Sequence, residues 1–185
     1  MKHCFLLLLL AEIVFLPSAS WAGDTAVAEP PGYRVDEYKS PVPRTLLGAG
    51  VIGIGEAERL WTEKAAIFLD VMPRLPKPGK LPEGTIWRDK VRRNIPGSIW
   101  LANTGYGALT PEMEHYFRVS LTELTSGDQS RRIVFYCMTD CWMSWNAAKR
   151  AVSWGYRAVT WFPEGADGWE AANLPLAEAL PYGAP

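Results

Sequence analysis

The chain has 185 residues, and 48% of them are hydrophobic, which is enough for one domain with a single buried core. Its 19 Lys and Arg residues nearly balance its 20 Asp and Glu residues, so the formal net charge is −1 at pH 7. This balance excludes the long-range positive field by which proteins attract nucleic acid or an anionic membrane surface. We therefore expect no nucleic-acid partner.

Residues 1–22 have the pattern of a secretory signal peptide. Lys2 precedes an apolar run to Leu16, and small residues follow up to Ala22. A retained membrane anchor is the alternative, but the run is short for a bilayer and Glu12 interrupts it. We expect export to the periplasm and no membrane contact after the signal peptide is cleaved.

Cleavage would remove Cys4 and leave Cys137 and Cys141 as the only cysteines, with His115 as the only histidine. A zinc site made of nitrogen and sulfur ligands would need more than these, and a histidine-dependent hydrolase would have to use His115. In an oxidising compartment, two lone cysteines either pair or are kept reduced for a purpose.

Strand and helix patterns alternate along the chain after an extended arm at residues 23–44. We expect strands at 51–54, 67–72, 98–103, 132–136 and 156–162, and helices at 56–64, 110–124, 144–154 and shortly after 165. Residues 73–97 contain five prolines and predict a long surface loop. The alternation predicts an α/β domain over residues 45–175, with a central parallel sheet covered on both faces, and a tail at 176–185.

Cys137 follows directly on the apolar strand 132–136, and a short loop then leads to the next helix. This places the thiol at the carboxyl end of a parallel strand, facing the amino end of a helix, where α/β sheets hold their sites. Backbone N–H groups and the helix dipole lower the pKa of a thiol at such a position. Cys137 is therefore our candidate nucleophile, with Cys141 as its resolving or partner thiol.

The segments around this loop resemble the rhodanese-like domains. The matching residues are Tyr136-Cys137, Ala147-Ala148, Gly155-Tyr156 and GADGW (165–169), preceded by LDVMPR (69–74) and NIPGSIWL (94–101). The resemblance extends over residues 45–172 and implies a three-layer domain that carries out sulfur transfer. More narrowly, the two cysteines followed by Trp142 resemble the periplasmic CXXCW-motif proteins associated with PQQ-dependent alcohol catabolism, which implies an accessory role in that oxidation.

The loop departs from the sulfurtransferase pattern in its charge. Residues 138–143 contain no Arg or Lys, and Asp140 would repel an anionic donor by about 1 kcal/mol at contact range. Ordinary thiosulfate sulfurtransfer is therefore less expected. The basic run WRDKVRRN (87–94) is typical of a solvated loop, although one of its arginines could supply an anion contact if the loop folds over the site.

The residues that we expect around the substrate are Asp140, Trp142, Ser144, Trp169 and Asp70. Asp70 ends an apolar strand, where it could orient an arginine or accept backbone N–H bonds. Trp142 and Trp169 fall at the ends of elements and are our candidate pocket walls, whereas Trp145, Trp154 and Trp161 fit a core face.

Three other interpretations of the site stay open. Cys137 and Cys141 could form a purely structural disulfide, because their spacing is compatible with a disulfide. With Met138 and Met143, the two cysteines could instead bind Cu(I). A noncatalytic accessory protein of a quinone-dependent dehydrogenase system would use the tryptophans in place of the thiols. We expect no resident cofactor or metal, and as partner a small sulfur or thiol compound or a component of a PQQ-dependent dehydrogenase system.

Overall fold

The protein is described by a computed structural model over residues 27–88 and 90–183. The predicted signal peptide lies outside these residues. Five strands form one sheet in the order β1-β6-β5-β2-β4, and every neighbouring pair is parallel. The strands are β1 (Gly50–Val51), β2 (Ile67–Asp70), β4 (Ile99–Trp100), β5 (Ile133–Tyr136) and β6 (Val159–Phe162).

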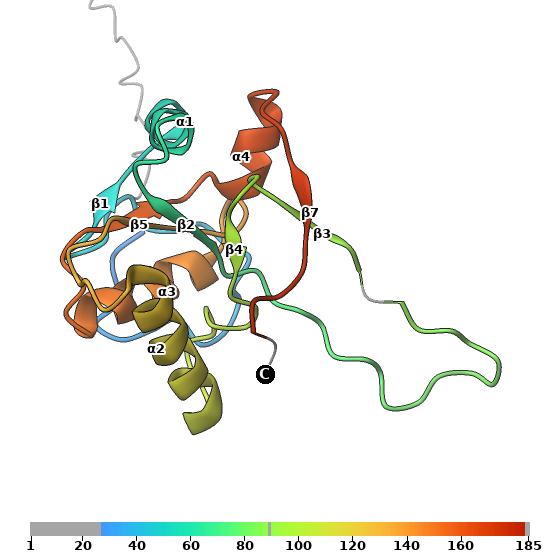
Figure 1. Ribbon diagram of the computed structural model, residues 1–185. Coiled ribbons are helices and arrows are strands. Elements are labelled where there is room, and N and C mark those ends of the chain that lie inside the picture. The colour runs from blue at the N-terminus through green and yellow to red at the C-terminus, as the bar shows by residue number, and fades with distance from the viewer. Residues whose placement is uncertain (1–26, 89, 184–185) are drawn as a thin grey trace, which may run out of the picture.

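Helices cover both faces of this sheet (Figure 1). Helices α1 (Ile54–Thr62) and α4 (Gly165–Ala171) lie on one face, and α2 (Pro111–Thr125) and α3 (Trp142–Ser153) lie on the other. Successive side chains of β5 alternate between the two faces, as a strand requires, so Phe135 packs with α2 and α3 while Tyr136 packs with α1 and α4. The predicted three-layer α/β fold with a central parallel sheet is therefore confirmed.

Helices α2 and α3 differ in how well the sequence predicts their first residues. Helix α2 begins where Thr110 and Pro111 predict, since Thr110 Oγ1 accepts a hydrogen bond from the Met113 N–H at 3.3 Å. Helix α3 begins at Trp142, two residues before the predicted start. Cys141 is extended and serves as the N-cap, so Trp142 and Ser144 belong to the first turn of the helix.

The C-terminal segment is part of the domain and not a separate tail. Strand β7 (Ala177–Ala179) pairs antiparallel with β3 (Arg92–Asn94), which lies in the predicted surface loop. The Tyr182 N–H then donates to the carbonyl of Trp100 at 2.9 Å. Strands this short depend on pairing with a distant segment and have little local signal of their own, which is why sequence patterns did not predict them.

The start of α4 packs directly against the cysteine loop. Gly165 has φ +56°, and a Cβ on it would lie 2.8 Å from the backbone N and Cα of Met138. The N–H of the next residue, Ala166, donates to the carbonyl of Cys137 at 3.1 Å. The backbone of the loop can approach α4 this closely only because residue 165 has no side chain.

We expect Gly165→Ala to lower the free energy of unfolding by about 3 kcal/mol, because backbone strain and a clash with the loop act together. Gly127→Ala is the matched control: its φ is +76°, but no heavy atom lies within 4 Å of the added Cβ. Strain alone should cost the control about 1 kcal/mol. Urea unfolding of both variants measures the difference. Equal losses of unfolding free energy would show that the close packing at residue 165 does not contribute to stability.

Candidate functional site

Cys137 and Cys141 form a disulfide at the carboxyl edge of the sheet. Cys137 follows β5 directly, Cys141 immediately precedes α3, and their Cα atoms are 6.3 Å apart. This separation lies within the range that disulfides need. Both residues are buried, with exposed fractions of 0% for Cys137 and 5% for Cys141. The oxidised pair is thus enclosed by its surroundings.

The turn between the cysteines depends on the backbone of Asp140. This residue has φ +51°, a left-handed conformation that Asp tolerates better than most residues. The side chain of Thr139 donates to the carbonyl of Glu164 at 2.9 Å and ties the turn to the start of α4. The side chain of Asp140 is itself exposed. In this conformation Asp140 shapes the loop through its backbone.

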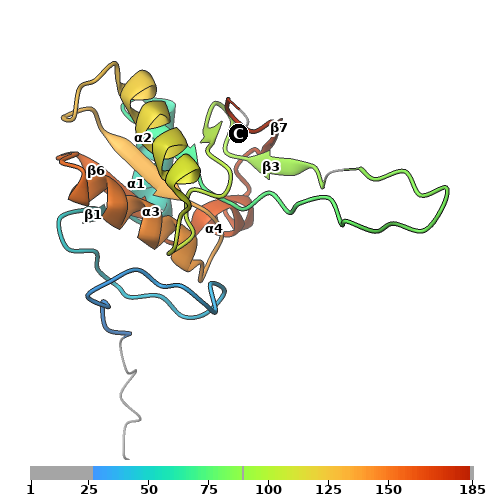
Figure 2. The same cartoon turned by 90° about the horizontal axis from the view of Figure 1, so that it is seen from below.

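The N-terminal arm, here residues 27–47, crosses over the cysteine loop. The Ser40 N–H donates to the Asp140 carbonyl at 3.1 Å, and the Trp142 N–H donates to the Tyr38 carbonyl at 2.9 Å. Between them, Lys39 forms an antiparallel bridge with Cys141, and its Nζ also contacts the carbonyl oxygen of Thr139. In Figure 2 the arm, in blue, runs along the side of the domain next to α3. The arm therefore pairs with the loop almost as a strand would.

Trp142 is anchored beneath this arm. Its Nε1–H reaches Ser40 Oγ at 3.0 Å and the Pro41 carbonyl at 3.1 Å, and the Arg34 guanidinium lies 5.5 Å from the ring centroid. Only 3% of Trp142 is exposed. Its position corrects our expectation of a pocket wall, because the ring packs into the core and its polar edge is used by the arm.

Ser144 and Trp169 also have internal partners. Ser144 Oγ donates to the Cys141 carbonyl at 3.1 Å and accepts from Trp161 Nε1–H at 3.0 Å, so it fixes the first turn of α3. Trp169 is fully buried in α4, with its ring 5.3 Å from that of Trp61. It lies on the α1 and α4 face of the sheet, away from the α3 face, and not at the pocket wall where we expected it.

Asp70 and Arg92 form a buried ion pair next to the cysteine loop. Asp70 Oδ2 is 2.6 Å from Arg92 Nε, and Asp70 Oδ1 accepts the Met72 N–H at 2.9 Å. Arg92 Nη2 donates to the carbonyl of Cys137 at 3.4 Å. Burial raises the pKa of the Asp70 carboxyl above its ordinary value, and the nearby guanidinium opposes that rise. Asp70 thus both orients an arginine and accepts a backbone N–H.

Met72 is a site residue that sequence reasoning did not single out. Its Sδ lies 3.4 Å from Cys137 Sγ, and it also lines a hollow of about 310 Å³ at the base of the loop between β2 and β3. The sequence instead indicates Met138 and Met143, which are close to the two cysteines along the chain. The strand register gives the missing signal, because Asp70 pairs with Tyr136 and so the residues after β2 lie beside those after β5.

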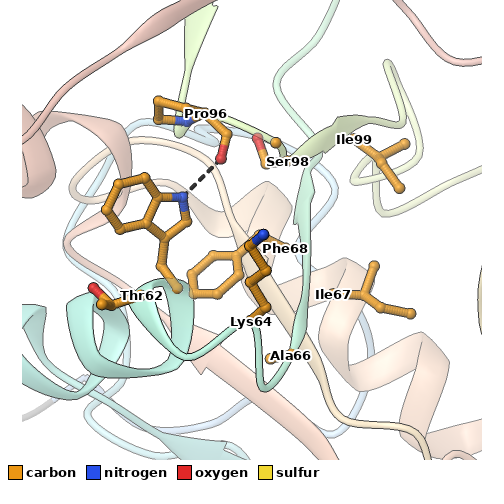
Figure 3. A pocket seen from close by; sticks show the side chains of 10 residues that line it. Thr62, Lys64, Ala66, Ile67, Phe68, Pro96, Ser98 and Ile99 are labelled. Carbon is orange, nitrogen blue, oxygen red and sulfur yellow. Dashed lines mark hydrogen bonds between the residues drawn. The ribbon is translucent and has the colours of Figure 1, made fainter.

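A larger hollow, of about 680 Å³, lies at the opposite end of the sheet (Figure 3). Ile67 and Ile99, which begin β2 and β4, line it together with Trp61, whose Nε1–H donates to the Pro96 carbonyl at 2.7 Å. None of the predicted site residues lines this hollow. Because the strands are parallel, it faces the amino ends of the strands, whereas the cysteines lie at the carboxyl ends.

Two absences hold for the residues that the structure describes. No group of three or more His, Cys, Asp and Glu side chains there is arranged to hold a metal ion. No helix in the same ranges is long and apolar enough to cross a membrane.

Among known proteins, this chain is similar only in structure, to several solved structures. No protein-family model matches the chain, and no curated protein matches it. The wild-type structure of EanB, which other structures show with hercynine or ergothioneine, has 21% identity and a TM-score of 0.49 over 77% of this chain and 34% of its own. This chain thus spans about a third of the length of EanB.

Two shorter proteins are also similar. The polysulfide-sulfur transferase homodimer of Wolinella succinogenes has 14% identity and a TM-score of 0.43 over 74% of this chain and 84% of its own. An uncharacterized protein from Saccharomyces cerevisiae has 18% identity and a TM-score of 0.41 over 67% of this chain and 92% of its own.

The Asp70–Arg92 pair predicts a stability that depends on pH. In Arg92→Met, Asp70 keeps its raised pKa without the opposing cation, so stability is retained below the ordinary carboxyl pKa of 3.8 and is lost as the pH rises through the raised value. We expect a loss of about 3 kcal/mol at pH 7, which shrinks toward pH 4. Arg93→Met, next to it but 58% exposed, should change little at either pH. Urea unfolding at both pH values checks this, and a loss that does not vary with pH would contradict it.

Because the arm covers the cysteine loop, we expect the disulfide to be reduced more slowly when the arm is in place than when it is loosened. Ser40→Pro removes the N–H that donates to Asp140, whereas Ser40→Ala keeps it and removes only the hydroxyl that Trp142 uses. If the lost hydrogen bond holds the arm by about 1 kcal/mol, dithiothreitol should reduce Ser40→Pro about fivefold faster than Ser40→Ala. Equal rates would show that the arm does not control access to the disulfide.

Proposed function

We propose that this protein carries out thiol-dependent sulfur transfer at Cys137, with the Cys137–Cys141 disulfide as its oxidised resting state. The observation that supports this most is the position of the pair at the turn from β5 to α3, on the carboxyl edge of a parallel sheet. A purely structural bridge is the weaker interpretation. So small a loop gains less from loop entropy than the roughly 3 kcal/mol of a 15-residue loop.

The proposed cycle begins with reduction. A small thiolate attacks Cys137 Sγ, forms a mixed disulfide and releases the Cys141 thiolate; a second thiolate then takes the first thiol away as a disulfide and leaves Cys137 reduced. The Cys137 thiolate next attacks the outer sulfur of a persulfide or polysulfide donor, which departs with one sulfur fewer. Cys141 finally attacks Cys137, restores the disulfide and expels hydrosulfide.

The structure suits this division of roles between the two thiols. Cys141 is the N-cap of α3, a helix of 12 residues, so the positive end of the helix dipole stabilises its thiolate as a leaving group. Cys137 is the cysteine whose sulfur contacts Met72, and Met72 in turn lines the hollow. The incoming reactant would therefore meet Cys137 before Cys141.

We also propose that the protein acts in the periplasm, as an accessory to PQQ-dependent alcohol oxidation. The supporting observations are the leader pattern of residues 1–22 and the resemblance of the loop to the CXXCW-motif proteins. A noncatalytic binding role depended on Trp142 and Trp169 as exposed walls. Both are buried and use their indole N–H groups in hydrogen bonds within the domain, so neither ring is placed as the wall of a binding site.

Cu(I) binding is a second candidate, because Met72 supplies a third soft ligand. Its Sδ lies 3.4 Å from Cys137 Sγ, so reduction of the disulfide would leave two thiolates and a thioether together. Titration of the reduced protein with Cu(I) tests this. Binding that is lost in Met72→Leu as well as in Cys137→Ser would support it, and binding that is unchanged in Met72→Leu would contradict it.

The experiment that tests sulfur transfer is intact-mass analysis after reduction, incubation with a polysulfide and trapping of thiols. In Cys141→Ser no partner thiol can displace the acquired sulfur, so we expect a stable gain of one sulfur on Cys137. The wild-type protein should return to the disulfide and release sulfide, and Cys137→Ser should acquire no sulfur. Sulfur that accumulates on Cys141 in Cys137→Ser, but not on Cys137 in Cys141→Ser, would contradict the assignment.

A further inference from the structure

The hollow beside Cys137 is formed by the two ends of one long loop. The loop leaves the sheet after β2 and returns at β3 (Figure 1). Residues 72–75 near its start and residues 87, 88 and 90–92 near its end enclose, together with Trp100 of β4, about 310 Å³. We call this space the basic hollow. Its volume is near the lower end for small-molecule sites, so it suits a molecule of a few heavy atoms.

Positive charge dominates the lining of the basic hollow. Arg74, Arg88, Lys90 and Arg92 line it, and no carboxylate does so among the described residues. Arg92 is neutralised by Asp70, but Arg88 and Lys90 are exposed to solvent at the rim. Cations at the rim of a cleft raise the local concentration of anions and their rate of entry. The hollow therefore favours an anion.

The rest of the lining is apolar and aromatic. Trp87 and Trp100 contribute indole rings, and Leu75 and Val91 contribute aliphatic side chains. Trp100 is held in place because its Nε1–H donates to the carbonyl of Met72 at 2.7 Å. Such walls take the carbon skeleton of a ligand, while the cations take its charge. An organic anion therefore fits better than a small inorganic one.

Met72 connects the basic hollow to the disulfide. Its side chain is partly exposed, lines the hollow and touches Cys137 Sγ, whereas Cys137 itself has no exposed surface. A methionine side chain is flexible and can change rotamer at little cost. Met72 is thus the side chain that stands between the hollow and Cys137 Sγ.

We propose that the basic hollow is the substrate pocket and that the substrate is a short organic thiol or persulfide with a sulfonate or carboxylate group, admitted to Cys137 by Met72. This inference rests on the proposed function and names its substrate class. The anionic group lies by Arg88 and Lys90, and the carbon chain lies between Trp87 and Trp100. The thiolate sulfur attacks Cys137 Sγ, the new S–S bond forms, and the electron pair of the old bond leaves on Cys141.

The test compares three thiols that share a two-carbon chain and differ in charge: 2-mercaptoethanesulfonate, 2-mercaptoethanol and cysteamine. At equal thiolate concentration and low salt, we expect the sulfonate to reduce the disulfide about tenfold faster than cysteamine, with the neutral thiol between them. The difference should vanish in 0.5 M salt and in an Arg88→Gln/Lys90→Gln variant. It should persist in Lys77→Gln/Lys80→Gln, a matched control from the same loop whose residues do not line the hollow.

Binding of an unreactive analogue separates this inference from the proposed function. The S-methyl ether of 2-mercaptoethanesulfonate cannot exchange, and its binding is read by tryptophan fluorescence. If the analogue binds the wild-type protein but not Arg88→Gln/Lys90→Gln, the pocket is supported. If the disulfide of the same wild-type protein is not reduced by any of the three thiols, the proposed function is overturned. Equal reduction by the three thiols without binding of the analogue would overturn the pocket and leave the function standing.

Discussion

The buried ion pair between Asp70 and Arg92 holds the site together. Asp70 ends β2, binds the Met72 N–H and has no exposed surface, so its charge needs a partner within the fold. Arg92 comes from β3, across the long loop, and reaches both this carboxylate and the carbonyl of Cys137. One pair thus sets the backbone after β2, closes the base of the loop and fixes the end of β5. The basic hollow exists because these three segments are joined there.

The remaining sides of the cysteine loop are closed by backbone contacts. The arm pairs with Asp140 and Trp142 on one side, and Gly165 and Ala166 pack against the loop on another. Contacts of this kind are not opened by rotation of a single side chain. Met72, by contrast, is one flexible side chain between Cys137 and a solvent-facing hollow. Because the backbone contacts are stiffer than the Met72 side chain, we expect a reactant to reach the disulfide from the side of Met72.

The sequence predicted those parts of the fold that depend on local pattern. Apolar runs located β2, β5 and β6, and the Thr110-Pro111 cap located α2, because burial and capping leave signals within a few residues. It also predicted the site loop. Trp142 and Trp169 were misplaced because a ring at an element end packs inward or outward according to distant neighbours, here the arm and Trp61. The β3–β7 pair and Met72 likewise depend on contacts between distant segments.

The charge around the disulfide shows the same dependence on tertiary structure. The loop itself has Asp140 and no cation, which by itself argues against an anionic reactant. Folding brings Lys39 to Thr139 from one side and Arg92 to Cys137 from the other, and places Arg88 and Lys90 at the rim of the hollow. Asp140 is exposed to solvent, so its repulsion is screened, whereas Arg88 and Lys90 lie at the hollow that leads toward the sulfur. An anionic reactant is therefore compatible with this loop because the segments that supply the positive charge are remote from it in sequence.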